Sequence, residues 1–219
     1  MTEPAPGTEG VRTLRHEYET RGLDVSDLAP DPLAQFARWY EEAAAEGIYE
    51  PHAMTLSTAG PDGRPASRYV LLRGVDDRGF QFFTSHRSAK ARDLAATGAA
   101  ALTWGWLELH RQVRARGAVT RLTAAESDAY FRSRPRGSQI AAWASPQSEV
   151  IADREELERR VADVEARFAG APVPRPEHWG GYLLEPRDVE FWQGRHSRLH
   201  DRLRYRRSGD AWIVERLAP

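Results

Sequence analysis

Cysteine is absent from this 219-residue sequence, which excludes disulfide bonds, thiolate metal sites and a cysteine nucleophile. The absence is compatible with a reducing compartment, and we expect a cytoplasmic protein. No apolar run approaches the length of a membrane-spanning helix, and the opening residues have neither a basic start nor an apolar core, so we expect no signal peptide. Charge of one sign is also missing, since Lys+Arg 31 and Asp+Glu 32 give a formal net charge of -1. We therefore expect no membrane and no nucleic-acid partner.

Several catalytic motifs are missing as well. The sequence has no Gly-rich dinucleotide fingerprint, no phosphate-binding Gly-Lys-Ser/Thr loop and no Gly-x-Ser-x-Gly elbow. His196 and His200 are four residues apart, but Arg198 between them repels a cation, so we expect no metal site. What remains is a set of separated arginines, aromatic residues and a histidine, which suits a flat, phosphorylated ligand.

Hydrophobic periodicity predicts a mixture of helices and short strands. Asp31-Pro32 is a typical helix start, and apolar residues recur on one face until Gly47. Further helices are predicted from Ser88 to Thr97, from Thr123 to about Arg132 and from Asp153 to Phe168. Strands are predicted at 53–58, 67–74, 80–84, 99–106, 109–120, 181–185, 189–193, 202–206 and 211–216.

This order of elements indicates an α+β fold, an antiparallel β-barrel with peripheral helices, and the family resemblance given below implies that the barrel is a split β-barrel. We predict a disordered tail at residues 1–10 and a single domain at 11–219. Residues 11–21 are too polar to be held by core packing, and we predict a short helix there that acts as a flap. In the strand at 109–120, polar side chains alternate with apolar ones, as in a barrel wall that faces ligand or solvent.

Two basic stretches are candidate anion sites. The first turn after Ser88 carries Lys90 and Arg92 beside free backbone N–H groups, although a solvated basic turn explains it equally well. Residues 190–202 combine Trp192, Arg198 and His200 with further charges; the alternative is a strand with solvated ion pairs. Arg offers a planar donor fork for phosphate, and His transfers protons near neutral pH.

Residues in these two stretches, with others along the chain, resemble those of a known protein family. The chain resembles the pyridoxine/pyridoxamine 5′-phosphate oxidase family, FMN-dependent split-barrel enzymes that work as homodimers. The resemblance covers nearly the whole chain, and its most specific segments are Arg111-Gln112-Val113, Tyr130-Phe131 with Ser133-Arg134-Pro135-Arg136, and Phe191-Trp192-Gln193-Gly194 with Arg198-Leu199-His200-Asp201-Arg202.

The resemblance implies the site residues. The residues matching FMN-binding positions are Arg68, Val70, Leu71, Leu72, Arg73, Phe83, Thr84, Ser88, Lys90, Gln112, Gln147, Ser148, Trp192 and Arg202. Among them, Gln147, Ser148, Trp192 and Arg202 match positions that the other subunit supplies. The residues matching substrate-binding positions are Arg15, Tyr18, Arg73, Tyr130, Arg134, Ser138, Arg198 and His200.

Within that substrate set, Arg73, Tyr130, Arg134 and Ser138 would bind the substrate phosphate. Arg198 and His200 would lie over the pyridine ring as the catalytic pair, and Arg15 to Tyr18 would close as a lid. The implied reaction oxidises pyridoxine or pyridoxamine 5′-phosphate to pyridoxal 5′-phosphate and reduces O2 to hydrogen peroxide. Whether His200 moves a proton, positions the ring or pairs with Asp201 stays open at this point.

The sequence departs from the family pattern at three places, and these departures bear on which reaction we expect. Ala89-Lys90 replaces the usual Arg-Lys, Arg73 replaces a Lys, and Trp104 to Glu108 replaces Phe-Pro-Trp-His in a wall expected near the flavin. Ala89 and this wall favour an alternative, a related oxidase of a bulkier reduced ring such as a phenazine precursor. A third alternative is a non-catalytic binder of FMN or pyridoxal phosphate.

Overall fold

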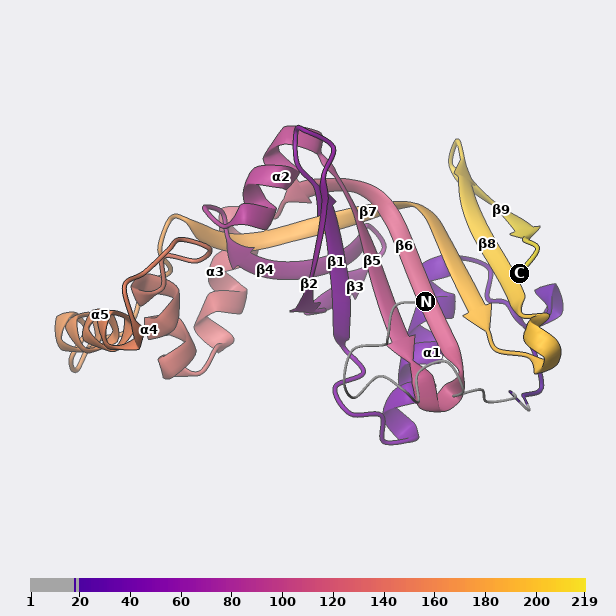
Figure 1. The fold of residues 1–219 in the computed structure, drawn as a ribbon, viewed down its shortest axis with the longest axis horizontal. Helices are drawn as coiled ribbons and strands as arrows, with labels where there is room; N and C mark the ends of the chain where they lie inside the picture. Colours follow the sequence, from indigo (N-terminus) through magenta and orange to yellow (C-terminus); the bar gives the residue numbers. More distant parts are fainter. Residues whose placement is uncertain (1–17, 19) are drawn as a thin grey trace, which may run out of the picture.

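The computed structural model describes residue 18 and residues 20–219 (Figure 1). In this part of the chain, nine strands form one antiparallel sheet in the order β2-β1-β5-β6-β7-β4-β3, with β8 paired to β7 and β9 to β8. Their bounds are β1 Ala53–Ala59, β2 Pro65–Leu71, β3 Gly74–Asp76, β4 Gly79–Ser85, β5 Ala99–Trp106, β6 Arg111–Arg121, β7 Trp179–Gln193, β8 Asp201–Ser208 and β9 Ala211–Arg216. The predicted antiparallel split barrel is confirmed, and most strand ends fall within two residues of the prediction.

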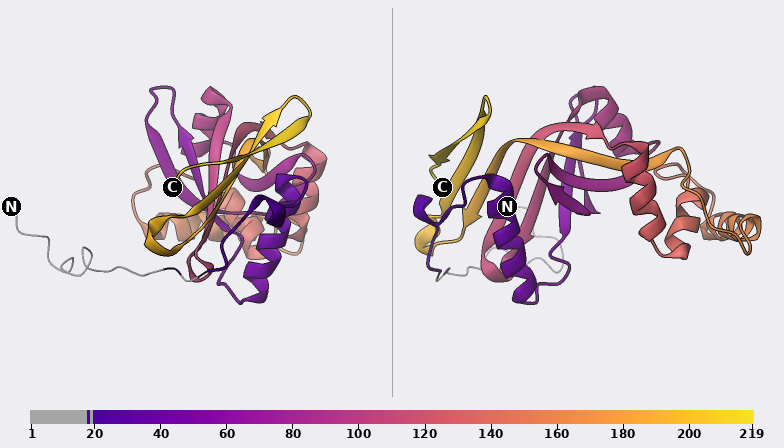
Figure 2. Two further views of the ribbon diagram at one scale, coloured as in Figure 1. Left: turned by 90° about the vertical axis from the view of Figure 1, so that its right-hand side faces the viewer. Right: turned by 180° about the vertical axis from the view of Figure 1, so that it is seen from behind.

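Strand β7 is the longest element of the sheet. It pairs with β4 over its first residues, with β8 over its last, and with β6 along most of its length. The prediction of two separate strands here was wrong. The register of β6 on β7 shifts between Arg116 and Gly117, so that Arg187 is an extra residue of β7 beside Pro186 and the strand continues past the proline. Such a bulge tolerates proline and bends a strand without ending it. Figure 2 shows β7 curving across the molecule.

The helices flank this sheet. They are α1 Pro32–Ala45, α2 Ala89–Thr97, α3 Ala124–Ser133, α4 Arg136–Ala144 and α5 Arg154–Arg167, with short 3-10 turns η1 Val25–Asp27, η2 Leu107–Leu109 and η3 His196–Arg198. The Asp31 carboxylate caps α1 by accepting from the backbone N–H groups of Leu33 and Ala34, as predicted. Among the described residues, no helix is long and apolar enough to cross a membrane.

Two hydrophobic clusters hold these layers together. Phe36 of α1 packs against Phe80 and Trp104 of the sheet, with ring centroids 5.0 and 4.7 Å away. A second cluster, containing Phe131, Ile140 and Trp179, lies under α3, α4 and α5, which project from one end of the molecule (Figure 1). The two ends of β7 therefore pack against different hydrophobic clusters.

Some predictions fall outside the described residues or need correction. Residues 1–10 and most of the helix predicted at 11–21 lie outside the described residues, and Thr20 and Arg21 are not helical. The strand predicted at 67–74 is divided between β2 and β3. Trp104 and Trp106 are buried in the core, so their side chains do not form the flavin wall that the sequence suggested.

Candidate active site

A pocket of about 650 Å³ lies between β2, β4, α2 and the α3–α4 segment. Its lining residues come from distant parts of the sequence and include most of those matched to cofactor and substrate phosphate. They are Arg68, Tyr69, Val70, Leu71, Arg73, Phe83, Thr84, Lys90, Tyr130, Ser133, Arg134, Pro135, Ser138, Gln147 and Trp179. We call it the basic pocket.

The charges in the basic pocket are all of one sign. Arg68, Arg73, Lys90 and Arg134 line it, and none of the lining residues is a carboxylate. Burial lowers the pKa of Lys90, and the nearby Arg68 lowers it further. Burial likewise lowers the pKa of Arg134, with Tyr130 acting in the opposite direction and Arg73 adding to the decrease. A bound anion would relieve this repulsion, so the pocket fits phosphate groups.

The floor of the basic pocket is a polar triangle. Thr84 Oγ1 donates to Gln147 Oε1 at 2.8 Å, while Lys90 Nζ lies 3.2 Å from Thr84 Oγ1 and 3.1 Å from Gln147 Oε1. Lys90 stands in the first turn of α2, where backbone N–H groups favour an anion. Arg68 reaches the same region from β2 and donates to Thr58 Oγ1 at 2.7 Å. Together these groups form a donor-rich cradle.

The opposite wall is aromatic. Phe83 and Tyr130 stack with ring centroids 3.9 Å apart, and Tyr130 lies nearly parallel to Trp179. The Arg134 guanidinium sits 4.4 Å from the Trp179 ring centroid. Its Nη1 is buried without a hydrogen-bond partner among the described residues. Buried donors are usually satisfied, and because Arg134 also lines the pocket, its guanidinium is a candidate partner for an anionic ligand.

Six residues matched to FMN-binding positions do not line the basic pocket, and three of them, Leu72, Ser88 and Ser148, lie near it in the chain without facing it. Ser88 is fully buried, and its hydroxyl donates to the Ser85 carbonyl at 2.8 Å, so it is not directed to a ligand. Leu72 is buried and lines a neighbouring pocket of about 550 Å³. Ser148 is exposed, with a φ of 73°. Trp179, in contrast, lines the pocket although the sequence analysis did not select it; it lies two residues before the strand predicted from residue 181, and β7 begins with it.

A second group of matched residues lies at the other end of β7. Gln112, Trp192 and Arg202 are register partners on β6, β7 and β8, so their side chains lie on one face of the sheet. The His200 ring lies 4.6 Å from Trp192, and Tyr18 lies 5.9 Å from His200. We use the name aromatic row for five residues, of which three are aromatic: Tyr18, Gln112, Trp192, His200 and Arg202. Arg198 is exposed beside it, and Arg15 lies outside the described residues.

Arg202 is held by an ion-pair network. Its Nε donates to Glu190 Oε1 at 2.8 Å, and Arg114 donates to the other oxygen of Glu190 at 2.6 Å. Glu190 is only 2% exposed; burial alone raises its pKa, but the pairs with Arg202 and Arg114 lower it overall. Ala218 O accepts from Arg202 Nη1 at 2.8 Å. The guanidinium is thus fixed from two sides.

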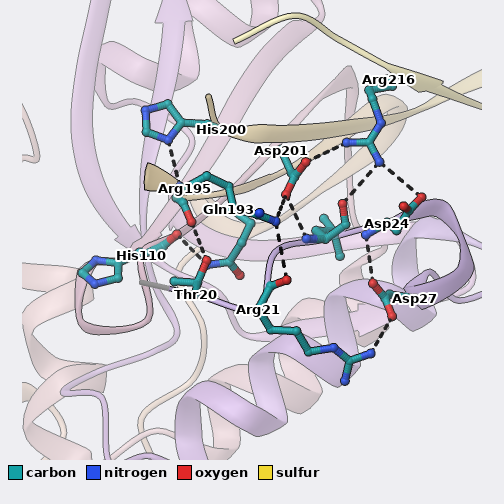
Figure 3. A network of polar contacts seen from close by, with 12 residues as sticks. Thr20, Arg21, Asp24, Asp27, His110, Gln193, Arg195, His200, Asp201 and Arg216 are labelled. Atoms are coloured by element: carbon teal, nitrogen blue, oxygen red, sulfur yellow. Dashed lines mark hydrogen bonds and ion pairs between the residues drawn. The ribbon is translucent and has the colours of Figure 1, made fainter. Parts of the chain in front are cut away.

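His200 belongs to a further polar network (Figure 3). Its Nδ1 accepts from the Arg195 backbone N–H at 3.1 Å, and burial, followed by the charge of Arg198, lowers its pKa. Asp201 pairs with Arg195 and Arg216 instead of with His200. The ion pair between His200 and Asp201 that the sequence left open is therefore not formed.

The basic pocket and the aromatic row lie far apart in one chain. Trp179 stands in the pocket and Trp192 in the row, and the intervening strand rises about 3.3 Å per residue, roughly 40 Å in all. Figure 1 shows β7 running across the molecule from the side of α3 to the side of β8 and β9. No single small ligand spans that distance.

Two of the matched residues have notable contacts within this chain. Gln147, matched to a position that the other subunit supplies, contacts Thr84 and Lys90. Gln112, matched to a flavin-contacting position, pairs with Trp192, because the register of β6 on β7 holds it at the far end of the sheet.

Comparisons with known proteins agree with this geometry. The family described as "Pyridoxamine 5'-phosphate oxidase" matches residues 40–168, and "Pyridoxine 5'-phosphate oxidase C-terminal dimerisation region" matches residues 179–219. A pyridoxine/pyridoxamine 5'-phosphate oxidase of Rubrobacter xylanophilus is 56% identical over 215 residues, which are 96% of this chain and 99% of that protein. The protein of the same name from Thermosynechococcus vestitus is 57% identical over 209 residues, which are 95% of this chain and 99% of that protein.

Solved structures give the same picture. PhzG from Burkholderia lata, in complex with tetrahydrophenazine-1-carboxylic acid, has a TM-score of 0.84 at 36% identity over 89% of this chain and 95% of that one. A pyridoxamine 5'-phosphate oxidase-related, FMN binding protein from Nostoc punctiforme has a TM-score of 0.69 at 20% identity, covering 88% of this chain and 100% of its own, and supports the fold alone. The chain belongs to the pyridoxamine 5'-phosphate oxidase family of FMN-dependent oxidases.

Proposed function

We propose that this protein is an FMN-dependent oxidase that converts pyridoxine 5′-phosphate or pyridoxamine 5′-phosphate to pyridoxal 5′-phosphate, with O2 reduced to hydrogen peroxide. The observation that carries this proposal is the basic pocket, in which four cations meet without a carboxylate beside an aromatic stack. A flat, doubly phosphorylated assembly of cofactor and substrate matches that combination of charge and shape.

The residues divide between two phosphate groups. Lys90, Arg68 and Thr84 would hold the FMN phosphate at the start of α2, with Val70 and Leu71 beside the flavin. Arg73, Tyr130, Arg134 and Ser138 would hold the substrate phosphate; Arg134 is the best placed because its Nη1 lacks a partner within the described chain. When bound, FMN supplies the redox chemistry, accepting a hydride from the substrate and passing the electrons to O2. The protein contributes orientation and charge neutralisation.

A homodimer completes the site in this proposal. The aromatic row is too far from the basic pocket of its own chain, so the row of one subunit would face the pocket of the other. Trp192 and Arg202 would contact the flavin, and Arg198 and His200 would lie over the substrate ring. The match of residues 179–219 to a dimerisation region supports this arrangement. The reaction has no step that requires a membrane or nucleic acid.

The test is an aerobic peroxide assay on the FMN-loaded protein, run with both phosphorylated vitamers, their unphosphorylated forms and a reduced phenazine carboxylic acid. We expect peroxide release with the phosphorylated vitamers and at least tenfold lower efficiency without the phosphate, because the pocket loses its charge-assisted contacts. Flavin-loaded protein that ignores both phosphorylated vitamers would contradict the substrate assignment.

Oxidation of a reduced phenazine ring is the second candidate, favoured by the likeness to PhzG. Gly105 pairs with Gln112 in the sheet and a side chain there would meet nothing within 4 Å, which leaves room for a bulkier ring beside the aromatic row. Peroxide release with the phenazine substrate alone would select this candidate. Tight FMN binding without peroxide from any substrate would select a non-catalytic binder.

A further inference from the structure

The loop that carries Arg198 and His200 is strained. Ser197 and Arg198 have φ values of 55° and 61°, so two consecutive non-glycine residues are in the left-handed region. Such a conformation costs on the order of 1–2 kcal/mol per residue and persists only where the surroundings impose it. The residues that restrain the loop therefore decide where His200 points.

The restraint comes from the segment Thr20 to Asp24, which we call the strap. Thr20 Oγ1 donates to the Gly194 carbonyl at 2.6 Å, and Leu23 N donates to Asp201 Oδ2 at 3.0 Å, so the strap contacts both ends of the loop. Gly22 has a φ of +87°, and a Cβ at this position would collide with the Arg195 guanidinium. Glycine thus allows Arg195 to lie directly against the strap.

Asp201 is the hub of these contacts (Figure 3). One oxygen accepts from Arg195 Nη1 at 3.2 Å and the other from Arg216 Nη1 at 2.7 Å. Arg216 also reaches Asp24 of the strap at 3.2 Å. Asp201 is 17% exposed by its side chain, so these contacts are partly shielded from water. The Arg195 backbone is consequently held in one place relative to the His200 ring.

That placement determines which nitrogen of His200 carries the proton. A backbone N–H donates only, so the Arg195 amide at 3.1 Å requires His200 Nδ1 to be unprotonated. A neutral imidazole then has its proton on Nε2. The described titratable and charged groups around the ring are Arg195, His196 and Arg198 of the loop, Tyr18 before the strap, His110 at the end of η2 and Asp201. Asp201 is the carboxylate among them, and it pairs with Arg195 and Arg216 instead of with His200.

We propose that Arg195 and Asp201 are positioning residues that fix His200 as its Nε2–H tautomer, so that His200 serves the reaction as a hydrogen-bond donor and not as a base. Its part in the reaction rests on the proposed function, whereas the tautomer does not. The donor would face electron-rich atoms of the substrate ring and stabilise charge developing there.

The first test is 15N NMR of histidine-labelled, FMN-loaded full-length protein at neutral pH, with the His200 signals identified from the spectrum of His200→Gln. We expect an unprotonated Nδ1 and a protonated Nε2 in the wild type. In Arg195→Ala and in Asp201→Asn, the two nitrogens should shift toward the averaged values of exchanging tautomers. Gly22→Ala displaces Arg195 from the strap side and should act in the same direction if either variant fails to fold. Arg21→Ala is the control, because its side chain is 89% exposed and pairs with Asp27 away from the loop.

The second test separates a donor from a base. His200→Gln places an amide N–H near the position of Nε2, and we expect it to retain turnover within about tenfold, whereas His200→Asn, which reaches only the position of Nδ1, should lose about 100-fold. A wild-type spectrum with the proton on Nδ1, unshifted spectra in all the loop variants, or equal losses in the Gln and Asn variants would overturn the proposal. If the tautomer is as expected but no phosphorylated vitamer is oxidised, the proposed function fails and the tautomer assignment stands.

Discussion

The basic pocket and the aromatic row differ in how their arginines are paired. Beside the row, Arg202 pairs with Glu190, Arg204 and Arg206 pair with Glu215, and Arg195 pairs with Asp201. In the pocket, Arg73, Lys90 and Arg134 have no carboxylate partner among the described residues, and Arg68 is 4.0 Å from Asp93. Cations grouped without a carboxylate partner repel one another, so a protein retains such a group where a ligand supplies the negative charge. The other paired arginines serve position and folding, whereas the pair with Glu190 holds Arg202 where the proposed function places it against the flavin.

The largest expected effect comes from the pocket cation with the unsatisfied donor. Arg134→Met keeps an apolar stem against Trp179 but removes the guanidinium. We expect the KM for the phosphorylated substrate to rise by about 10- to 100-fold, the worth of a charge-assisted hydrogen bond of roughly 1.5–3 kcal/mol. Steady-state kinetics measure this, and Arg132→Ala, an exposed position in the last turn of α3 just before Arg134, is the control. An unchanged KM would remove Arg134 from the phosphate site.

The two regions should also separate FMN binding from turnover. Arg68→Ala should weaken FMN binding about tenfold, because a buried donor to the phosphate is lost. Arg198→Ala should lower kcat much more than FMN content, since Arg198 is exposed on the strained loop and far from the pocket of its own chain. Flavin fluorescence titration and kcat at saturating FMN provide the two readouts, with Arg64→Ala as the exposed control. Equal effects of both variants on both quantities would contradict this division of roles.

A half-buried histidine outside the basic pocket, His86, predicts a pH effect on stability. Burial, together with Arg121, Arg175 and His178, lowers the pKa of His86 from 6.5 to about 4. As pH falls from about 6.5 to about 4, the unfolded chain takes up a proton that the folded chain refuses, so stability is lost in this window and not above it. With allowance for solvent screening the loss is roughly 2 kcal/mol.

The variant His86→Phe tests that effect, because phenylalanine keeps a ring against Tyr182 without a titrating group. Urea unfolding at pH 7 and pH 5 should show a smaller acid loss in the variant than in the wild type. The same pH dependence in both proteins would mean that His86 is not the group that titrates.

The smallest effect is expected in the paired region. Arg204→Ala breaks an ion pair with Glu215 in which both side chains are more than a quarter exposed. Partly exposed pairs contribute about 0–1 kcal/mol, so the free energy of unfolding should change by no more than that, and FMN affinity should not change. A loss of FMN in this variant would break the distinction between ligand-binding and structural arginines.

Periodicity and turn residues predicted much of the fold. The limits of β5 and β9 and the cap of α1 agree with the sequence, because each has a local signal such as Asp31-Pro32 or the Ser208-Gly209-Asp210 turn. The continuity of β7 was missed, since Pro186 normally ends a strand and only pairing with β6 absorbs it in a bulge. Long-range register is not encoded in any one segment.

The candidate site, like the fold, could be predicted from the sequence only in part. Its residues were selected through the family resemblance, and the structure brings together those of the basic pocket. The grouping of Gln112 with Trp192, the contact of Gln147 with Lys90 and the burial of Ser88 all depend on strand pairing and side-chain direction. None of these has a local sequence signal. Trp179 was missed for the same reason.

The central claim is that one active site combines the basic pocket of one subunit with the aromatic row of the other. Co-expression of Arg68→Ala and Arg202→Ala chains with different tags, followed by purification of the mixed dimer, tests it most directly. At an FMN concentration below the weakened Kd of the Arg68→Ala chain, each variant alone should have far less activity than the wild type, and the mixed dimer, with one intact site of two, should regain about half of the wild-type activity per dimer. A mixed dimer as inactive as both parents would contradict the claim.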